Sequence, residues 1–337
     1  MKKKFSVGII GYGRMGQNHA KAIQKIKSCR LKYILEKNDL EKSRNLKNIK
    51  FYKNEKDFFE NKIDLLIIST TTDVRFNFTI LAIKKGIKKI FLEKPMADSY
   101  DKCLKLISLA KKKKISIRVN HQMEHMPIYR DLVKIINSKN LGGLVSMSVN
   151  GGNFGLAMNG SHYIYAFLMI SNDIVKEVFC NLESKILKNP RGKKFKDNSG
   201  ILLVKTLKKK FLVINSLYKQ HHGMSVTYNC KYGIIYINEF NGSLKINYRK
   251  KQYRNLPSQR YGLPEINKVS KIKLSLDLEK TTRDGILDLL KNKYLKNLSW
   301  SRQVVKVLML AQQSNIEKKI IKSNNSTKYN SRTFKWA

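Results

Sequence analysis

Acidic residues are scarce in this sequence of 337 residues: 24 Asp and Glu stand against 68 Lys and Arg, a formal net charge of +44. Such a charge alone would suggest a partner such as nucleic acid or an anionic membrane. Only 13 of the basic residues are Arg, however, and the 55 Lys are spread along the whole chain. Proteins that read bases and phosphates concentrate Arg and aromatic side chains on one face. We therefore interpret the charge as a compositional bias at exposed positions and expect no specific nucleic-acid partner.

Cysteine is also rare, and the four residues lie far apart, at Cys29, Cys103, Cys180 and Cys230. Because no CxxC pair occurs, the sequence signals neither a zinc site nor a disulfide framework, and we expect free thiols and no metal. No run approaches the roughly 20 apolar residues of a membrane span. The apolar run near the start breaks at Gly11, too early for a secretion signal. The sequence therefore predicts a cytoplasmic protein without a membrane partner.

Proline and glycine are few, with 5 and 18 residues, while 42% of the chain is hydrophobic. This composition excludes disordered and collagen-like chains, because enough apolar surface is present to form a core. The length is that of two domains at about 100 to 200 residues each. We expect an α/β protein with one domain at residues 1–121 and a second at residues 122–337.

The first 120 residues alternate apolar runs typical of strands with segments of helical periodicity. The expected strands are 5–10, 31–35, 63–69, 90–92 and 115–119. The expected helices are 18–27, 55–60, 76–85 and 99–113. Because the strands are almost continuously apolar, they predict a parallel sheet with helices on both faces, the doubly wound Rossmann arrangement.

A glycine motif, GxGxxG, occupies the first turn between strand and helix, at residues 11–16. Gly11 permits the tight turn, Gly13 lets the backbone approach a pyrophosphate, and Gly16 allows the helix to pack closely on the strand. The amide groups and the positive dipole end of the helix attract phosphate. We therefore place Arg14 and Met15, between these glycines, in a dinucleotide site.

An acidic residue, Glu36, follows the second strand about 20 residues after the motif. A carboxylate at this point can accept a hydrogen bond from the ribose 2′-hydroxyl, which favours NAD. Lys37 and Arg14 lie close enough in sequence to accommodate the 2′-phosphate of NADP instead. The expected cofactor is therefore NAD or NADP, with NAD favoured.

A second motif, Glu93-Lys94-Pro95, follows the strand at 90–92. Ligands of open α/β sheets bind at the carboxyl ends of the strands. Pro95 restricts the backbone of the residue before it. The motif therefore aims Lys94 at a reacting centre.

With these motifs the sequence resembles the Gfo/Idh/MocA family of oxidoreductases, named for glucose-fructose oxidoreductase and inositol dehydrogenase. The resemblance runs from about residue 4 to about residue 319 and includes a late helical stretch with Ala311 and Ser314. The matching segments are 11–16, 64–73, 93–95, 151–152 and 159–162. It implies that the second domain has a large, mostly antiparallel, open-faced sheet that often mediates homodimers or homotetramers.

Short runs of β-forming residues in the second half agree with such a sheet. They lie at 145–149, 176–182, 201–205, 211–216, 225–229, 234–238 and 244–248. Turn residues separate them. The pattern favours one antiparallel sheet.

The resemblance implies an NAD(P)-dependent dehydrogenase or reductase that transfers a hydride between the cofactor and a hydroxyl or carbonyl carbon of a sugar, polyol or nucleotide sugar. Lys94 and His162 match the family's catalytic positions, and we expect the two to meet over the nicotinamide. Alcohol oxidation needs a group that takes the hydroxyl proton, and imidazole titrates near neutrality.

Further contacts follow from the same motif matches. Besides the glycine motif and Glu36, the expected cofactor-binding residues are Thr70, Thr71, Thr72, Arg75, Glu93, Lys94 and Gln122. The expected substrate-binding residues are Lys94, His121, Asn159, His162 and Tyr163.

One departure from the family pattern concerns the acids around His162. Many members have an Asp four residues before this His and an acid three after it, whereas here Met158 and Tyr165 stand there. Proton transfer then depends on Lys94 and His162 alone, or the reaction differs. Two alternatives stay open: an NAD-dependent glycosidase that oxidises its substrate transiently, and a non-catalytic basic binding protein on the same scaffold.

Overall fold

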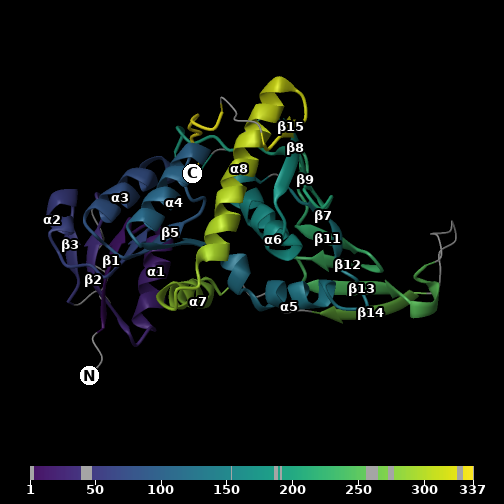
Figure 1. Ribbon diagram of the computed structural model, residues 1–337, viewed down its shortest axis with the longest axis horizontal. Coiled ribbons are helices and arrows are strands. Elements are labelled where there is room, and N and C mark those ends of the chain that lie inside the picture. Colours follow the sequence, from purple (N-terminus) through teal and green to yellow (C-terminus); the bar gives the residue numbers. More distant parts are fainter. Residues whose placement is uncertain are drawn as a thin grey trace. The chain divides into compact units, whose positions relative to one another are not determined.

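The computed structural model describes residues 4–38, 48–152, 154–185, 189, 192–255, 265–271, 277–324 and 329–336. The chain divides into two compact units (Figure 1). The first contains Met1–His125, Asp277–Val305 and Asn330–Ala337, and the second contains Met126–Leu276 and Lys306–Tyr329. Two late segments of the chain therefore pack with the N-terminal residues.

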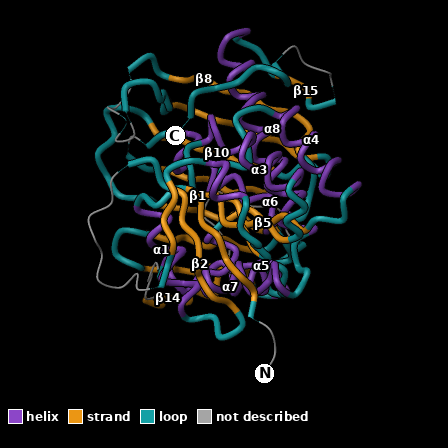
Figure 2. The backbone as a smooth tube through the Cα atoms, turned by 90° about the vertical axis from the view of Figure 1, so that its left-hand side faces the viewer, coloured by secondary structure: helices purple, strands orange, loops and turns teal. Residues whose placement is uncertain are grey.

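The first unit is built on a parallel sheet. Within the described residues it has six strands in the order β3-β2-β1-β4-β5-β6. These are β1 (Phe5–Ile10), β2 (Cys29–Leu35), β3 (Lys50–Tyr52), β4 (Leu65–Ile68), β5 (Lys89–Glu93) and β6 (Ser116–Asn120). Figure 2 shows β1 and β2 side by side, and all neighbouring pairs are parallel. The strand order reverses between β1 and β4, which is where ligands of such sheets bind.

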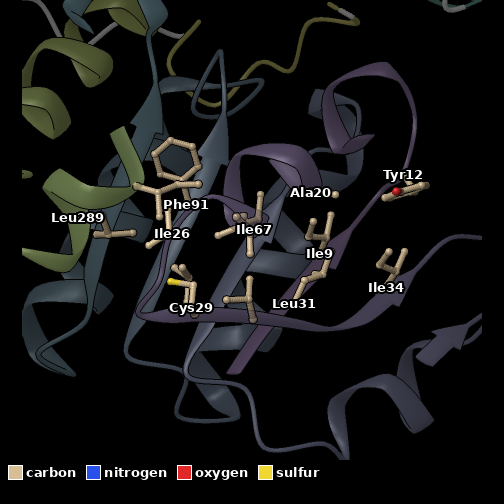
Figure 3. Close-up of a cluster of buried hydrophobic side chains, with 14 residues drawn as sticks. Ile9, Tyr12, Ala20, Ile26, Cys29, Leu31, Ile34, Ile67, Phe91 and Leu289 are labelled. Carbon is tan, nitrogen blue, oxygen red and sulfur yellow. The ribbon is translucent and has the colours of Figure 1, made fainter. Parts of the chain in front are cut away.

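Helices cover both faces of this sheet. They are α1 (Arg14–Gln24), α2 (Glu55–Phe59), α3 (Thr72–Lys84), α4 (Tyr100–Lys112), the 3₁₀ turn η1 (Gln122–His125) and α7 (Leu278–Leu290). Helices α1 and α7 pack against each other, as do α3 and α4. Figure 3 shows Ile9, Ile67 and Phe91 of the strands in one buried cluster with Ala20 of α1 and Leu289 of α7. Helix α7, which begins at Leu278, thus completes the core beside α1, which ends at Gln24.

The second unit contains a mixed sheet. In the described part of the chain its order is β14-β13-β12-β11-β7-β10-β9-β8-β15. The strands are β7 (Leu144–Asn150), β8 (Val175–Leu182), β9 (Gly200–Thr206), β10 (Phe211–Ser216), β11 (Ser225–Cys230), β12 (Gly233–Asn238), β13 (Ser243–Arg249), β14 (Glu265–Lys271) and β15 (Ile321–Lys322). Neighbours are antiparallel except for β7 and β10, which are parallel. The predicted fold class, with a parallel and a mostly antiparallel sheet, is confirmed.

One face of this sheet is buried. The second unit contains α5 (Pro127–Ile136), the π-helical turn η2 (Leu156–Gly160), α6 (Ser161–Ser171), the short η3 (Lys251–Tyr253) and the second half of α8 (Leu295–Glu317). Alternate residues such as Met147 and Val149 are fully buried, while Ser146 and Ser148 on the other face are half-buried. That open face is where the resemblance predicts self-association. Among the residues described, no helix has the length and apolar character needed to cross a membrane.

Candidate active site

The glycine turn between β1 and α1 is shaped by two close contacts and one open position. Gly11 has a φ of +86°, and a Cβ on it would lie 3.1 Å from the backbone carbon of Ser69. A Cβ on Gly16 would lie 2.1 Å from the carbonyl oxygen of Gly11. A Cβ on Gly13 would meet no atom beyond its chain neighbours within 4 Å. Gly11 and Gly16 are therefore required by packing, whereas Gly13 leaves space beside the turn.

The N-terminus of α1 offers amide groups to an anion. Gly13 is the N-cap and has no side chain to cap the helix, and no acidic residue lies in the first turn. In α4, by contrast, Ser99 Oγ accepts a hydrogen bond from the N–H of Lys102. Arg14, exposed, and Met15, half-buried, begin α1. Uncapped amides at the positive end of a helix dipole form a binding site for phosphate.

Glu36 directs its carboxylate toward the glycine turn. Its Oε2 accepts a hydrogen bond from the N–H of Tyr12 at 2.7 Å, and its Oε1 accepts one from the N–H of Asn38 at 3.1 Å. Lys37 is exposed and its Nζ lies 3.9 Å from Glu55 Oε1. The acid at the end of β2 and the glycine motif are therefore brought together as the sequence predicts.

The loop after β4 contacts the same turn. Ser69 Oγ donates a hydrogen bond to the carbonyl oxygen of Gly11 at 2.6 Å. The buried hydroxyl of Thr70 has no hydrogen-bond partner among the described residues. Thr71 Oγ1 donates to Asp73 Oδ1 at 2.5 Å, and Thr72 Oγ1 donates to the carbonyl oxygen of Trp336 at 2.7 Å. Of the three predicted threonines, Thr70 is therefore the one whose hydroxyl lacks a protein acceptor.

Arg75 is buried beneath the loops at the carboxyl edge of the sheet. Its guanidinium donates hydrogen bonds to the carbonyl oxygens of Thr70 and Pro95. These residues follow β4 and β5 respectively. The sequence predicts Arg75 as a cofactor contact, and the structure shows that its guanidinium joins the two loops.

Glu93 ends β5 inside the first unit and precedes the half-buried Lys94. Its Oε1 accepts hydrogen bonds from His19 Nε2 at 2.9 Å and Asn120 Nδ2 at 2.8 Å. Burial favours a higher pKa for this carboxyl, but the hydrogen bonds and positive charge of His19, the bond from Asn120 and the charge of Arg75 lower the pKa to about 2. Glu93 is thus a buried carboxylate at neutral pH.

The two remaining predicted residues of the first unit follow β6. His121 and Gln122 are both buried, and Gln122 begins η1. The predicted cofactor residues therefore lie at the carboxyl end of β5, in the turns that follow β1, β2, β4, β5 and β6, or at the starts of the helices that those turns enter. The carboxyl ends of parallel strands share one edge of a sheet.

The second unit holds the other predicted residues at the start of α6. His162 is half-buried in the first turn of that helix, and Asn159 is exposed just before it. Tyr163 is buried, and its hydroxyl donates to Glu239 Oε2 at 2.5 Å, while Tyr129 donates to Oε1 at 2.7 Å. Burial and the neighbouring Glu239 carboxylate raise the pKa of Tyr163. The Tyr163 hydroxyl is thus engaged by the protein.

Asp197 places a carboxylate at the beginning of the same helical segment, which the sequence does not reveal. It accepts hydrogen bonds from the N–H groups of Ala157 at 2.8 Å and Met158 at 2.6 Å. Gly155 makes this approach possible, because a Cβ there would lie 2.0 Å from Asp197 Oδ2. The position occupied by Met158 therefore has an acid beside its backbone, contributed by a residue about 40 positions later.

Comparison with known proteins agrees with this geometry. Residues 5–121 match a family described as an oxidoreductase family with an NAD-binding Rossmann fold. A protein from Desulfitobacterium hafniense, described as an NADPH-dependent oxidoreductase, has 15% identity and a TM-score of 0.78 over 96% of this chain and 99% of its own.

Two further solved structures share the fold. Myo-inositol 2-dehydrogenase from Lactobacillus plantarum has 17% identity and a TM-score of 0.72 over 95% of this chain and 99% of its own. An oxidoreductase from Agrobacterium radiobacter, solved with NAD+, L-tartaric acid and magnesium, has 12% identity and a TM-score of 0.73 over 95% and 99%. At these identities the solved structures show a common fold over both units.

Proposed function

We propose that this chain, which residues 5–121 identify as a member of the Gfo/Idh/MocA oxidoreductase family, transfers a hydride between a nicotinamide dinucleotide and a hydroxyl or carbonyl carbon of a sugar, polyol or nucleotide sugar. The observation that carries the proposal is the glycine turn. Neighbouring backbone atoms leave no room for a side chain at Gly11 or Gly16, while Gly13 faces open space at the uncapped start of α1. A pyrophosphate needs that combination of space and amide donors.

Other residues at the same edge fit the rest of a dinucleotide. The hydroxyl of Thr70 lies buried in the neighbouring loop and has no acceptor within the part of the chain that the structure describes. The carboxylate of Glu36 lies against the turn and can accept a hydrogen bond from a ribose hydroxyl. The chain therefore supplies donors for the phosphates and an acceptor for the ribose.

The chemistry divides between cofactor and protein. A bound nicotinamide supplies the hydride acceptor or donor. In the oxidising direction, Lys94 or His162 takes the proton that leaves the substrate hydroxyl, and in the reducing direction it returns that proton. His162 is suited to this role because imidazole exchanges protons near neutral pH. Lys94 also places a positive charge where an alkoxide oxygen develops.

Gly13→Val is expected to weaken dinucleotide binding while leaving the fold intact. The Cβ of the new side chain meets no atom beyond its chain neighbours within 4 Å, and the φ of −65° at Gly13 is one that any residue adopts. The valine instead fills the space that the pyrophosphate needs. We expect the affinity for NADH to fall by at least about tenfold, equivalent to roughly 1.4 kcal/mol, in a calorimetric titration. The thermal midpoint should stay close to that of the wild type.

Gly16→Val is the matched control for the first variant, because its Cβ clashes with the Gly11 carbonyl oxygen and should lower the thermal midpoint itself. Unaltered NADH affinity in a folded Gly13→Val protein would contradict the proposed site. If the wild type binds neither NADH nor NADPH, the proposed function is wrong.

Glu36 is expected to make the protein prefer NADH over NADPH. Its carboxylate faces the turn, so it attracts a ribose hydroxyl and repels a 2′-phosphate. We expect NADPH to bind about tenfold more weakly, a difference of roughly 1.4 kcal/mol, and Glu36→Gln to narrow this gap. Parallel titrations with the two cofactors measure it. Equal affinities in the wild type would instead assign the site to both cofactors, with Arg14 and Lys37 as phosphate partners.

A further inference from the structure

The carboxylate of Glu93 is held in place by groups from separate elements. His19 belongs to α1 and Asn120 to β6, and both donate hydrogen bonds to Oε1. The backbone N–H of Lys94 donates to the other oxygen, Oε2, at 3.3 Å. Glu93 is only 6% exposed. One buried side chain thus links a helix, a neighbouring strand and the peptide unit of the proposed catalytic lysine.

His19 is fully buried, and its side chain contacts the Glu93 carboxylate. Its ring packs edge-to-face on Phe91, with centroids 5.7 Å apart and planes at 87°. An ionised carboxylate only accepts hydrogen bonds, so the proton of this contact is on Nε2. Nδ1 is buried and has no hydrogen-bond partner among the described residues. Among the described residues, the His19 side chain therefore makes one hydrogen bond, to Glu93.

The charge of Glu93 would be costly in this interior without such partners. An unpaired buried carboxylate loses several kcal/mol of hydration free energy, which hydrogen bonds and opposite charges must offset. The guanidinium of Arg75, from α3, contributes to the balance. Since the pKa of Glu93 is about 2, the side chain does not exchange protons during turnover at neutral pH. Its remaining effects on the reaction are position and electric field.

We propose that His19 and Asn120 are positioning residues for Lys94, and that they act through the Glu93 carboxylate by fixing the Lys94 peptide and the negative charge of the residue that precedes it. The proposal rests on the proposed function in one respect, namely that Lys94 faces the reacting centre. It adds two residues that neither the glycine motif nor the Glu-Lys-Pro motif contains.

The test measures how fast the Lys94 amine reacts with acetic anhydride as a function of pH in the intact protein, by mass spectrometry of the peptide that carries it. In His19→Leu, the Glu93 carboxylate loses a hydrogen-bond donor. Less of its negative charge is then offset, so that charge stabilises the Lys94 ammonium more strongly. We expect the pH midpoint of labelling to rise by about half a unit, or roughly threefold slower labelling. Glu93→Gln removes the charge, so the midpoint should fall. His19→Gln keeps an N–H donor and should restore most of the wild-type profile.

Two controls separate positioning from loss of stability. Lys84, exposed at the end of α3, should be labelled with the same profile in every variant. Asn61→Leu removes hydrogen bonds to the carbonyl oxygens of Asp57 and Phe58, away from Glu93 in the same unit, and should leave the Lys94 profile unchanged. If His19→Leu does not fold, Asn120→Leu removes the other donor to the same oxygen and should also raise the midpoint.

The outcomes distinguish this proposal from the proposed function. Shifts of the same sign in His19→Leu and Glu93→Gln, or no shift in either, would overturn the positioning role even if the wild type binds NADH. Opposite shifts in a protein that binds no dinucleotide would support the positioning role and sink the proposed function.

Discussion

Lys94→Met is expected to lower kcat/KM for the hydride transfer by about 100- to 10,000-fold, the usual contribution of a positioned acid or base. The lysine follows β5 at the carboxyl edge of the sheet, and its peptide is anchored by Glu93. Methionine has a similar length but neither charge nor proton. The variant should therefore lose both proton transfer and stabilisation of a developing alkoxide, so that kcat falls more than KM rises.

The measurement is the initial rate of NADH formation with the substrate that the wild type accepts from a panel of polyols, sugars and nucleotide sugars. Lys84→Met is the matched control, since it removes an amine from an exposed position of the same unit. It should behave as the wild type. If Lys94→Met keeps kcat within about threefold of the wild type, another group moves the proton, and His162→Asn becomes the variant that identifies it.

Arg118→Met is expected to lower the free energy of unfolding of the first unit by about 3 kcal/mol. Only 2% of the Arg118 side chain is exposed, and it donates to His125 at 2.9 Å and to the carbonyl oxygen of Lys293. Its guanidinium lies 2.8 Å from Glu124 and 3.8 Å from Asp288. Removing one partner of a buried ion pair usually costs about 3 to 5 kcal/mol. We use the lower end because both carboxylates are partly exposed.

Urea unfolding followed by tryptophan fluorescence measures this change in the relevant unit, because both tryptophans, Trp300 and Trp336, belong to the first unit. Arg30→Met is the control: Arg30 is exposed on β2, and its replacement should change stability by no more than about 0.5 kcal/mol. A loss below about 1 kcal/mol in Arg118→Met would show that the network adds little to stability.

The first unit was largely predictable because its strands are continuous apolar runs and its key turn is marked by glycines. The sequence predicts 5–10 as a strand, and β1 is Phe5–Ile10. Glu36, predicted from its spacing as a ribose ligand, accepts a hydrogen bond from Tyr12 in the glycine turn, and its contact with the ribose stays a prediction. The resemblance to the Gfo/Idh/MocA family is confirmed over residues 5–121, which match that family. The catalytic pair of Lys94 and His162 stays a prediction.

Other elements carry no local signal. Helix α6 (Ser161–Ser171) is apolar on nearly every side and buried almost throughout, so it lacks the periodicity that identifies a surface helix. The edge strand β3 (Lys50–Tyr52) is too short to form a pattern. Both were missed for these reasons.

Polar contacts across long sequence separations were likewise hidden. The bonds of Asp197 to the backbone of Met158 and of His19 to Glu93 depend on tertiary structure, and single residues of these types are common on any surface. A sequence pattern can place residues on the same element or at the same edge of a sheet. It does not predict which side chains of different elements contact each other.

Because α7 belongs to the first unit, the core of that unit cannot be complete until α7 has been synthesised. Residues 4–125 leave the ribosome long before Ile286 and Leu289, which cover the same buried cluster as Ile23 and Phe91. Until those side chains arrive, the nascent sheet lacks part of its apolar cover. The unit whose translation begins first therefore stays incomplete until most of the second unit has been synthesised.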